Sequence, residues 1–215
     1  MSEEHLNNIL DQISDFENEF IKSSERIMKA GNNKLFTLDF VALSINNRAI
    51  SLIKGYLTLA KADNYLTAVS LVRLQLDNAL RFFASTLVEN SSDFAEHFID
   101  GKAIRDYTDI DEKKLTDNYL AKKLENYFSG IKEIYEKTCG YIHFSDRHFF
   151  PTITREKRKD RSMQIVIGGS GNFTIDEKLD FSKTMLEVSK IVLIVVEQWK
   201  HEKIKLSDIY DGIKK

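Results

Sequence analysis

The chain contains very little proline and glycine, with one Pro and nine Gly in 215 residues. Strand-rich proteins need many tight turns, and these two residue types supply most of them. A sequence so poor in both, with long stretches of Lys, Glu, Leu and Ile, is typical of long helices. The length suits one domain with a sizeable core. We therefore predict a single all-α domain over residues 1–215.

Cysteine and long apolar runs are also scarce. The single cysteine, Cys139, cannot form an intramolecular disulfide, which is typical of a reducing compartment. The strongest apolar run is Ile191–Val196, whereas a membrane-spanning helix needs about 20 residues. Residues 1–12 are acidic and polar, unlike a signal peptide. These features predict a cytoplasmic protein with no membrane partner.

Basic charge is not in excess, because the formal net charge is −2. Nucleic-acid binding would therefore need a local basic patch. Residues 155–161 form such a patch, and Arg155, Lys157 and Arg158 are its candidate binding residues, since basic loops can hold phosphates. The alternative is a solvated loop, which is the commoner place for a run of charges.

Apolar residues recur at helical spacing over most of the chain. The segments with this pattern are 3–30, 37–61, 65–88, 115–135 and 176–204. They predict a bundle of five or six helices whose core covers about 37–150 and 176–204.

A short stretch before the last helix has a different character. Gln164–Ile167 and Phe173–Ile175 have strand-like compositions, and the turn residues Gly168–Asn172 separate them. The glycines lack the Lys-Ser or Lys-Thr pair of a phosphate-binding loop and the third glycine of a dinucleotide fold. We predict a small β-hairpin insertion at about 163–175.

The segment 65–88 is apolar almost all round, which predicts a buried helix. Its charged residues Arg73, Asp77 and Arg81 lie four apart on one ridge and need partners. A structural ion pair between Arg73 and Asp77 is favoured. The alternative is that both anchor a substrate or orient a histidine, so both are candidate binding residues.

Residues 135–148 concentrate the chemically useful side chains, with two of the five histidines and the only cysteine. If the preceding helix continues, Tyr135, Cys139 and His143 fall four apart and share one face. Lys137, Arg147 and His148 lie close by in the sequence. This stretch is the leading candidate for a functional site, with Tyr135 as a binding residue.

Two histidines beside an arginine could cleave a phosphodiester without a metal. We predict that His143 takes the proton of a ribose 2'-hydroxyl and that His148 protonates the leaving oxygen. Arg147 and Lys137 would neutralise charge on the phosphate. The alternatives are a structural His143, bonded to Tyr135 or to a backbone carbonyl, and a Cys139 nucleophile. No second ligand pair accompanies Cys139 and His143, so we predict no metal and no cofactor.

The arrangement resembles bacterial helical proteins of the HEPN superfamily. The resemblance covers about residues 40–150 and rests on the Arg-containing helix 71–83 and on the Tyr-x-x-x-Cys-x-x-x-His pattern of 135–143. The family's catalytic motif is an Arg followed after four to six residues by a His, and Lys137 stands at that distance before His143. The resemblance implies an all-α bundle, a homodimer with a shared active site, and a metal-independent ribonuclease of toxin–antitoxin or defence systems.

The functional prediction is therefore a HEPN-like protein that binds or cleaves RNA, with a second copy and an antitoxin as further partners. The alternative is a non-enzymatic helical bundle that binds a partner protein or a small ligand.

Overall fold

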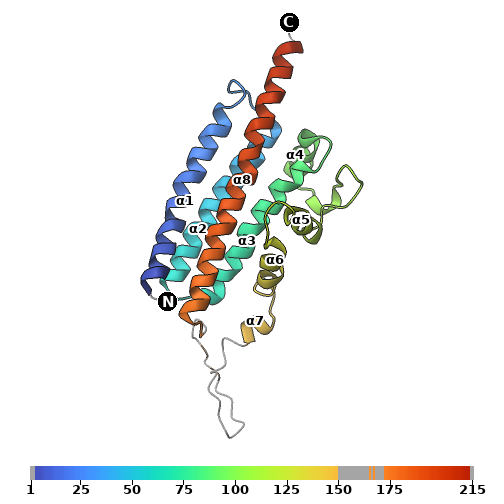
Figure 1. Ribbon diagram of the computed structural model, residues 1–215. Helices are drawn as coiled ribbons and strands as arrows, with labels where there is room; N and C mark the ends of the chain where they lie inside the picture. The colour runs from blue at the N-terminus through green and yellow to red at the C-terminus, as the bar shows by residue number, and fades with distance from the viewer. Residues whose placement is uncertain (1–2, 150–164, 166, 168–171, 214–215) are drawn as a thin grey trace.

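The computed structural model describes residues 3–149, 165, 167 and 172–213. Four long helices run side by side along the molecule (Figure 1). These helices are α1 (Glu3–Lys29), α2 (Thr37–Lys61), α3 (Tyr65–Phe83) and α8 (Ile175–Ile213). Each of α1 and α3 packs against both α2 and α8, which closes a four-helix bundle. The bundle core therefore includes residues 3–29, which lie outside the predicted core of 37–150 and 176–204.

Helix α3 is buried, as its sequence predicts. Val69, Val72 and Leu76 on one face are at most 1% exposed. Asn64 begins the helix, because its side chain accepts a hydrogen bond from the Thr67 backbone N–H at 3.3 Å and so satisfies a free donor of the first turn. A helix with so few exposed positions has to satisfy its charged residues within the protein.

The bundle contains a buried ion pair between α2 and α8. Lys203 Nζ lies 2.9 Å from the Asp39 carboxylate, and both side chains are fully buried. Asp39 also accepts hydrogen bonds from Trp199 Nε1 at 2.7 Å and from the Phe36 backbone N–H at 2.8 Å. Lys203 donates a further bond to the Ile27 carbonyl. These bonds tie the end of α1 and the start of α2 to α8.

Gly31 lies in the turn that joins α1 to α2, at a point where α8 passes closely. Its φ of +61° lies in the left-handed region, which glycine adopts without strain. A Cβ at this position would meet the Ser207 Cβ at 3.0 Å and the Lys203 carbonyl oxygen at 3.2 Å. The Ser207 hydroxyl donates to the Gly31 carbonyl at 2.9 Å. Both the backbone conformation and the space therefore require glycine.

Gly31→Ala should lower the free energy of unfolding by about 1 to 3 kcal/mol, because alanine would be strained there and crowded by α8. Urea unfolding followed by circular dichroism measures the change. Gly212→Ala is the matched control, since nothing lies near a Cβ at that position on α8. Equal stability of the Gly31→Ala variant and the wild type would contradict the close approach.

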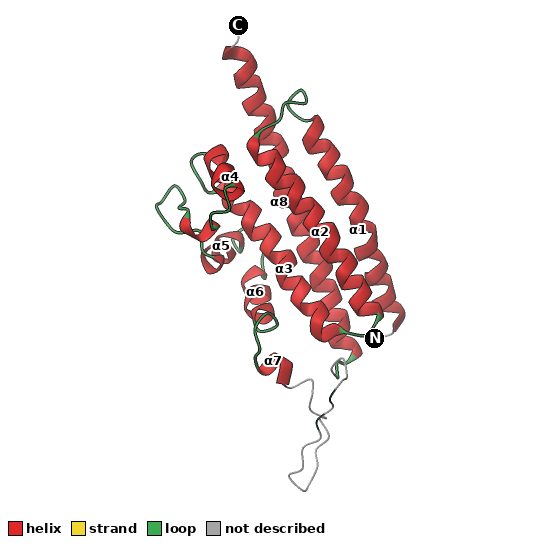
Figure 2. Ribbon diagram, turned by 180° about the vertical axis from the view of Figure 1, so that it is seen from behind, coloured by secondary structure: helices red, strands yellow, loops and turns green. Residues whose placement is uncertain are grey.

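Shorter helices lie on the α3 side of the bundle (Figure 2). They are α4 (Ser91–Ile99), α5 (Asp117–Leu124), α6 (Ile131–Cys139), α7 (Asp146–Phe149) and the 3-10 turns η1 (Ala84–Thr86) and η2 (Ile104–Asp106). Helix α4 packs against α2, and α5 and α6 pack against α3. This layer covers the charged ridge of α3.

The periodic segment 115–135 is interrupted between Leu124 and Ile131, and Gly130 lies in the interruption. Gly130 has a φ of +93°, which a right-handed helix does not allow. The Glu125 carboxylate accepts hydrogen bonds from the backbone N–H groups of Gly130 at 2.9 Å and Lys132 at 2.7 Å. Two short helices, α5 and α6, therefore replace one long helix.

The structure confirms the all-α prediction and corrects two details. The described residues form eight α-helices rather than five or six, because the segments that follow α3 are divided into short helices. No strand occurs among the described residues. Phe173 and Thr174 are irregular and Ile175 begins α8, so the predicted second hairpin strand is wrong. Most of the predicted first strand and the turn lie outside the described residues. None of the described helices is long and apolar enough to cross a bilayer.

Candidate functional site

A pocket of about 300 Å³ opens between α3, α5 and α6. We call it the His143 pocket. It is lined by Arg73, Leu74, Asp77, Asp117, Tyr135, Cys139, Ile142 and His143. Four of the predicted site residues therefore meet in one place. Helix α6 ends at Cys139, yet the following turn still carries His143 to the pocket that Tyr135 and Cys139 line.

Arg73 is the buried cation of the His143 pocket. Its Nη2 donates to the Asp117 carboxylate at 2.9 Å, and its side chain is 9% exposed. The guanidinium lies over the Tyr135 ring, 4.7 Å from the centroid, at the distance of a cation–π contact. Burial alone would lower the pKa of Arg73, but contacts with the Cys139 thiol and with Asp117 outweigh it and raise the pKa. Arg73 is therefore a permanent positive charge held in one orientation.

The predicted ion pair between Arg73 and Asp77 is not formed. Asp77 pairs with Arg48 of α2 at 3.2 Å and with Arg81 at 3.1 Å. Arg81 also reaches Asp117 at 2.5 Å. The charges alternate in the order Arg48, Asp77, Arg81, Asp117 and Arg73. Asp117 takes the place of Asp77 because α5 brings it against α3, where it is close to both arginines.

Sequence reasoning missed Asp117 as a member of the site. It lies 44 residues from Arg73, at the start of a helix of only eight residues. A sequence signal does mark the start of α5: Thr116 is its N-cap, and the Thr116 hydroxyl accepts a hydrogen bond from the Tyr119 backbone N–H. That signal gives the start of the helix but not the direction in which the helix packs.

Tyr135 and Cys139 form the wall of the pocket on α6. Burial raises the pKa of Tyr135, and its contact with Cys139 raises it further. The phenol therefore stays protonated at neutral pH and can donate a hydrogen bond. Cys139 is a free, half-buried thiol.

His143 is exposed at the pocket mouth, and it forms no hydrogen bond with another described residue. The turn before it is held firmly. The backbone N–H of Tyr141 donates to the Thr138 carbonyl at 3.0 Å, and the Ser70 hydroxyl of α3 donates to the Tyr141 carbonyl at 2.8 Å. Tyr141 itself is buried against Phe181 of α8. The backbone is therefore fixed while the imidazole remains available for a substrate.

The other predicted catalytic residues do not line this pocket. Lys137 pairs with Asp180 of α8 and lies over the Phe181 ring. Arg147 is exposed beside Gly140. His148 Nδ1 accepts from the Ser145 backbone N–H at 3.3 Å, and its ring stacks on Phe144.

Lys137 and His148 therefore already have interaction partners within the protein. The four residues predicted to be catalytic, His143, His148, Arg147 and Lys137, therefore do not converge on one pocket. The candidate binding residues Arg155, Lys157 and Arg158 lie outside the described residues.

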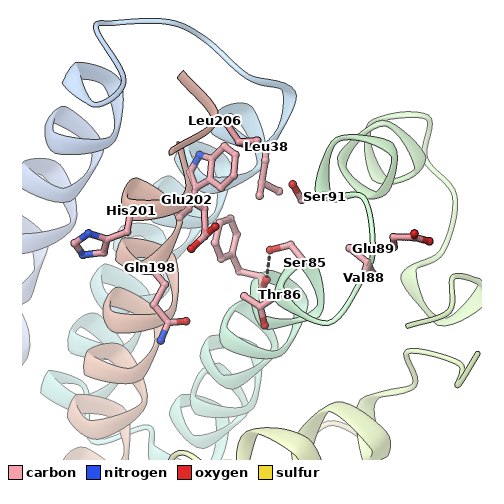
Figure 3. A pocket seen from close by; sticks show the side chains of 12 residues that line it. Leu38, Ser85, Thr86, Val88, Glu89, Ser91, Gln198, His201, Glu202 and Leu206 are labelled. Atoms are coloured by element: carbon pink, nitrogen blue, oxygen red, sulfur yellow. Dashed lines mark hydrogen bonds between the residues drawn. The ribbon is translucent and has the colours of Figure 1, made fainter. Parts of the chain in front are cut away.

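A larger pocket, of about 580 Å³, lies at the C-terminal end of α3, between α2, α3 and α8 (Figure 3). Apolar side chains such as Leu38 and Leu206 line it together with Glu89 and Glu202. No lysine or arginine is among its described lining residues, and none of the predicted site residues contributes to it. An anionic substrate would therefore be unfavourable there.

The described part of the chain contains no group of three His, Cys, Asp or Glu side chains close enough together to hold a metal ion. The His143 pocket instead combines a free imidazole, a buried guanidinium, a phenol and a thiol. No protein-family model, curated protein sequence or solved structure matches this chain.

Proposed function

We propose that the protein is a HEPN-like endoribonuclease that cleaves RNA at the His143 pocket without a metal ion. One observation carries the proposal: the unpaired imidazole of His143 and the buried guanidinium of Arg73 line the same pocket. A general base and a fixed cation are the two groups that transesterification of RNA needs most.

In the proposed reaction, His143 takes the proton of the ribose 2'-hydroxyl. The 2'-oxygen then attacks phosphorus, the bond to the 5'-oxygen breaks, and a 2',3'-cyclic phosphate forms. Arg73 would neutralise the developing negative charge, since its guanidinium has five N–H donors and not all of them are needed for Asp117. The Tyr135 phenol would donate a hydrogen bond to a phosphate oxygen.

The leaving 5'-oxygen needs a proton. The position of His148, stacked on Phe144 and outside the pocket, does not favour it as the acid. The family resemblance implies a homodimer with a shared active site, and the imidazole of the second copy could then supply this proton. The proposed defence or toxin–antitoxin role rests on the same resemblance.

Incubation of the purified protein with single-stranded RNA in excess EDTA tests the proposal. We expect cleavage that leaves 2',3'-cyclic phosphate and 5'-hydroxyl ends, detected by ligation and by mass spectrometry. Intact RNA after prolonged incubation with correctly folded protein would refute a ribonuclease, and 3'-hydroxyl ends would refute this chemistry.

Arg73→Lys should reduce the cleavage rate by about 10²-fold or more, because lysine keeps the charge but loses the planar fork that holds a phosphate. Single-turnover kinetics measure the loss. Arg26→Lys is the matched control, since Arg26 forms an ion pair with Glu197 between α1 and α8. An unchanged rate in the Arg73→Lys variant would show that Arg73 serves only the structure.

A non-enzymatic bundle that binds a partner protein or small ligand is the second candidate. The alternating chain of ion pairs from Arg48 to Arg73 favours it, because each of these charges already has a partner within the protein. Folded protein that neither cleaves nor binds RNA would support this candidate.

A further inference from the structure

A third pocket, of about 510 Å³, also has Asp77 in its lining. We call it the Arg105 pocket. Four cationic side chains line it, and Asp77 is the only acidic residue among its described lining residues. The cations are Arg48 of α2, Arg81 of α3, and Lys102 and Arg105 from the segment between α4 and α5. Positive charge therefore gathers here from three separate parts of the chain.

The carboxylates near these cations do not balance them. Asp77 is shared between Arg48 and Arg81. Arg81 also pairs with Asp117, but that carboxylate is shared in turn with Arg73. Among the described residues, the Lys102 ammonium pairs only with Asp100, and both of these side chains are more than half exposed, so the ion pair is weak. Arg105 is exposed and forms no ion pair within the described part of the chain. An anion entering the pocket would thus meet cations that lack full compensation.

Apart from Ser44 and Asn78, apolar side chains form the rest of the Arg105 pocket. Val41, Ile45 and Ile104 are buried below it, while Phe98 of α4 leaves 39% of its surface exposed at the side. The volume is within the usual range of about 300 to 1,000 Å³ for small-ligand sites. A ligand that suits this pocket therefore carries a strongly anionic group, which pairs with the guanidinium groups, and an apolar group, which packs against Phe98.

We propose that the Arg105 pocket binds a small phosphate monoester that carries an aromatic or alkyl group. Guanidinium groups hold a dianionic phosphate through paired, charge-assisted hydrogen bonds. The phosphate would compete with Asp77 for Arg48 and Arg81. The proposal does not depend on the ribonuclease activity proposed for the His143 pocket.

Isothermal titration calorimetry with phenyl phosphate at low ionic strength tests the proposal. Phenyl phosphate should bind at least about 10-fold more tightly than inorganic phosphate, because its ring covers apolar surface. Phenol should not bind, since it lacks the anion. Methyl phenyl phosphate, a monoanionic diester like the linkages of RNA, should bind more weakly than the monoester. Equal binding of diester and monoester, or of phenyl phosphate and inorganic phosphate, would overturn the proposal.

Two variants locate the binding site. Arg105→Ala should weaken phenyl phosphate binding by about 10-fold, as expected for loss of one charged contact. Lys183→Ala, which removes an exposed charge from α8, is the matched control and should leave the affinity unchanged. Phe98→Ala should weaken binding of phenyl phosphate but not of inorganic phosphate. Thermal melts establish that each variant is folded, and unchanged affinity in the Arg105→Ala variant would place the ligand elsewhere.

Discussion

His143→Ala should lower the rate of RNA cleavage by about 10²- to 10⁴-fold, the usual contribution of a general base. The effect should be this large because His143 is the histidine that lines the same pocket as Arg73. No other described side chain forms a hydrogen bond with its imidazole. Folding should be unaffected, since the residue is exposed. Single-turnover kinetics in excess EDTA measure the rate without a contribution from product release.

His148→Ala is the matched control for this prediction. The two histidines lie five positions apart, but the structure places His148 against Phe144 and outside the His143 pocket. We expect the control to keep most of the activity. Loss of cleavage in His148→Ala with full activity in His143→Ala would reverse the assignment and move the site toward α7.

Lys203→Met should lower the free energy of unfolding by about 3 to 5 kcal/mol, the cost of leaving a buried charge without its partner. Methionine has a similar length, so the change is chiefly the loss of the ammonium group. The Asp39 carboxylate would remain fully buried, with hydrogen bonds from Trp199 and Phe36 but no cation. Urea unfolding followed by circular dichroism measures the change.

Lys205→Met is the matched control, because Lys205 pairs with Glu202 on the same helix and its side chain is 69% exposed. Its effect should stay within about 0.5 kcal/mol. Adding Asp39→Asn to Lys203→Met should recover part of the lost stability, since the amide oxygen can still accept from Trp199 while the buried charge is removed. A double variant less stable than the single one would contradict this explanation.

Periodicity predicted the long helices well. The segment 37–61 has the same bounds as α2, and the segment 65–88 begins at the same residue as α3. These features depend on residues within a few positions of each other. The co-location of Tyr135, Cys139 and His143 was also predictable from their spacing, although α6 ends at Cys139.

Contacts between distant segments could not be predicted from the sequence. The partner of Arg73 is 44 residues away and the partner of Lys203 is further still, so no local pattern marks either pair. The exclusion of His148 from the pocket depends on the turn at Ser145, whose hydroxyl donates to the Gly140 carbonyl at 2.7 Å. Packing directions of short helices decide such details, and periodicity does not specify them.

Nuclear magnetic resonance of histidine-labelled protein tests the central claim most directly. The ring signals of the five histidines are followed while an RNA with 2'-fluoro sugars, which cannot be cleaved by this chemistry, is added. The His143→Ala spectrum identifies the His143 signal. RNA binding at the His143 pocket predicts a saturable shift of that signal, with no shift at His201 on α8. Saturable RNA binding that leaves the His143 signal unmoved would contradict the claim that the pocket is the RNA site.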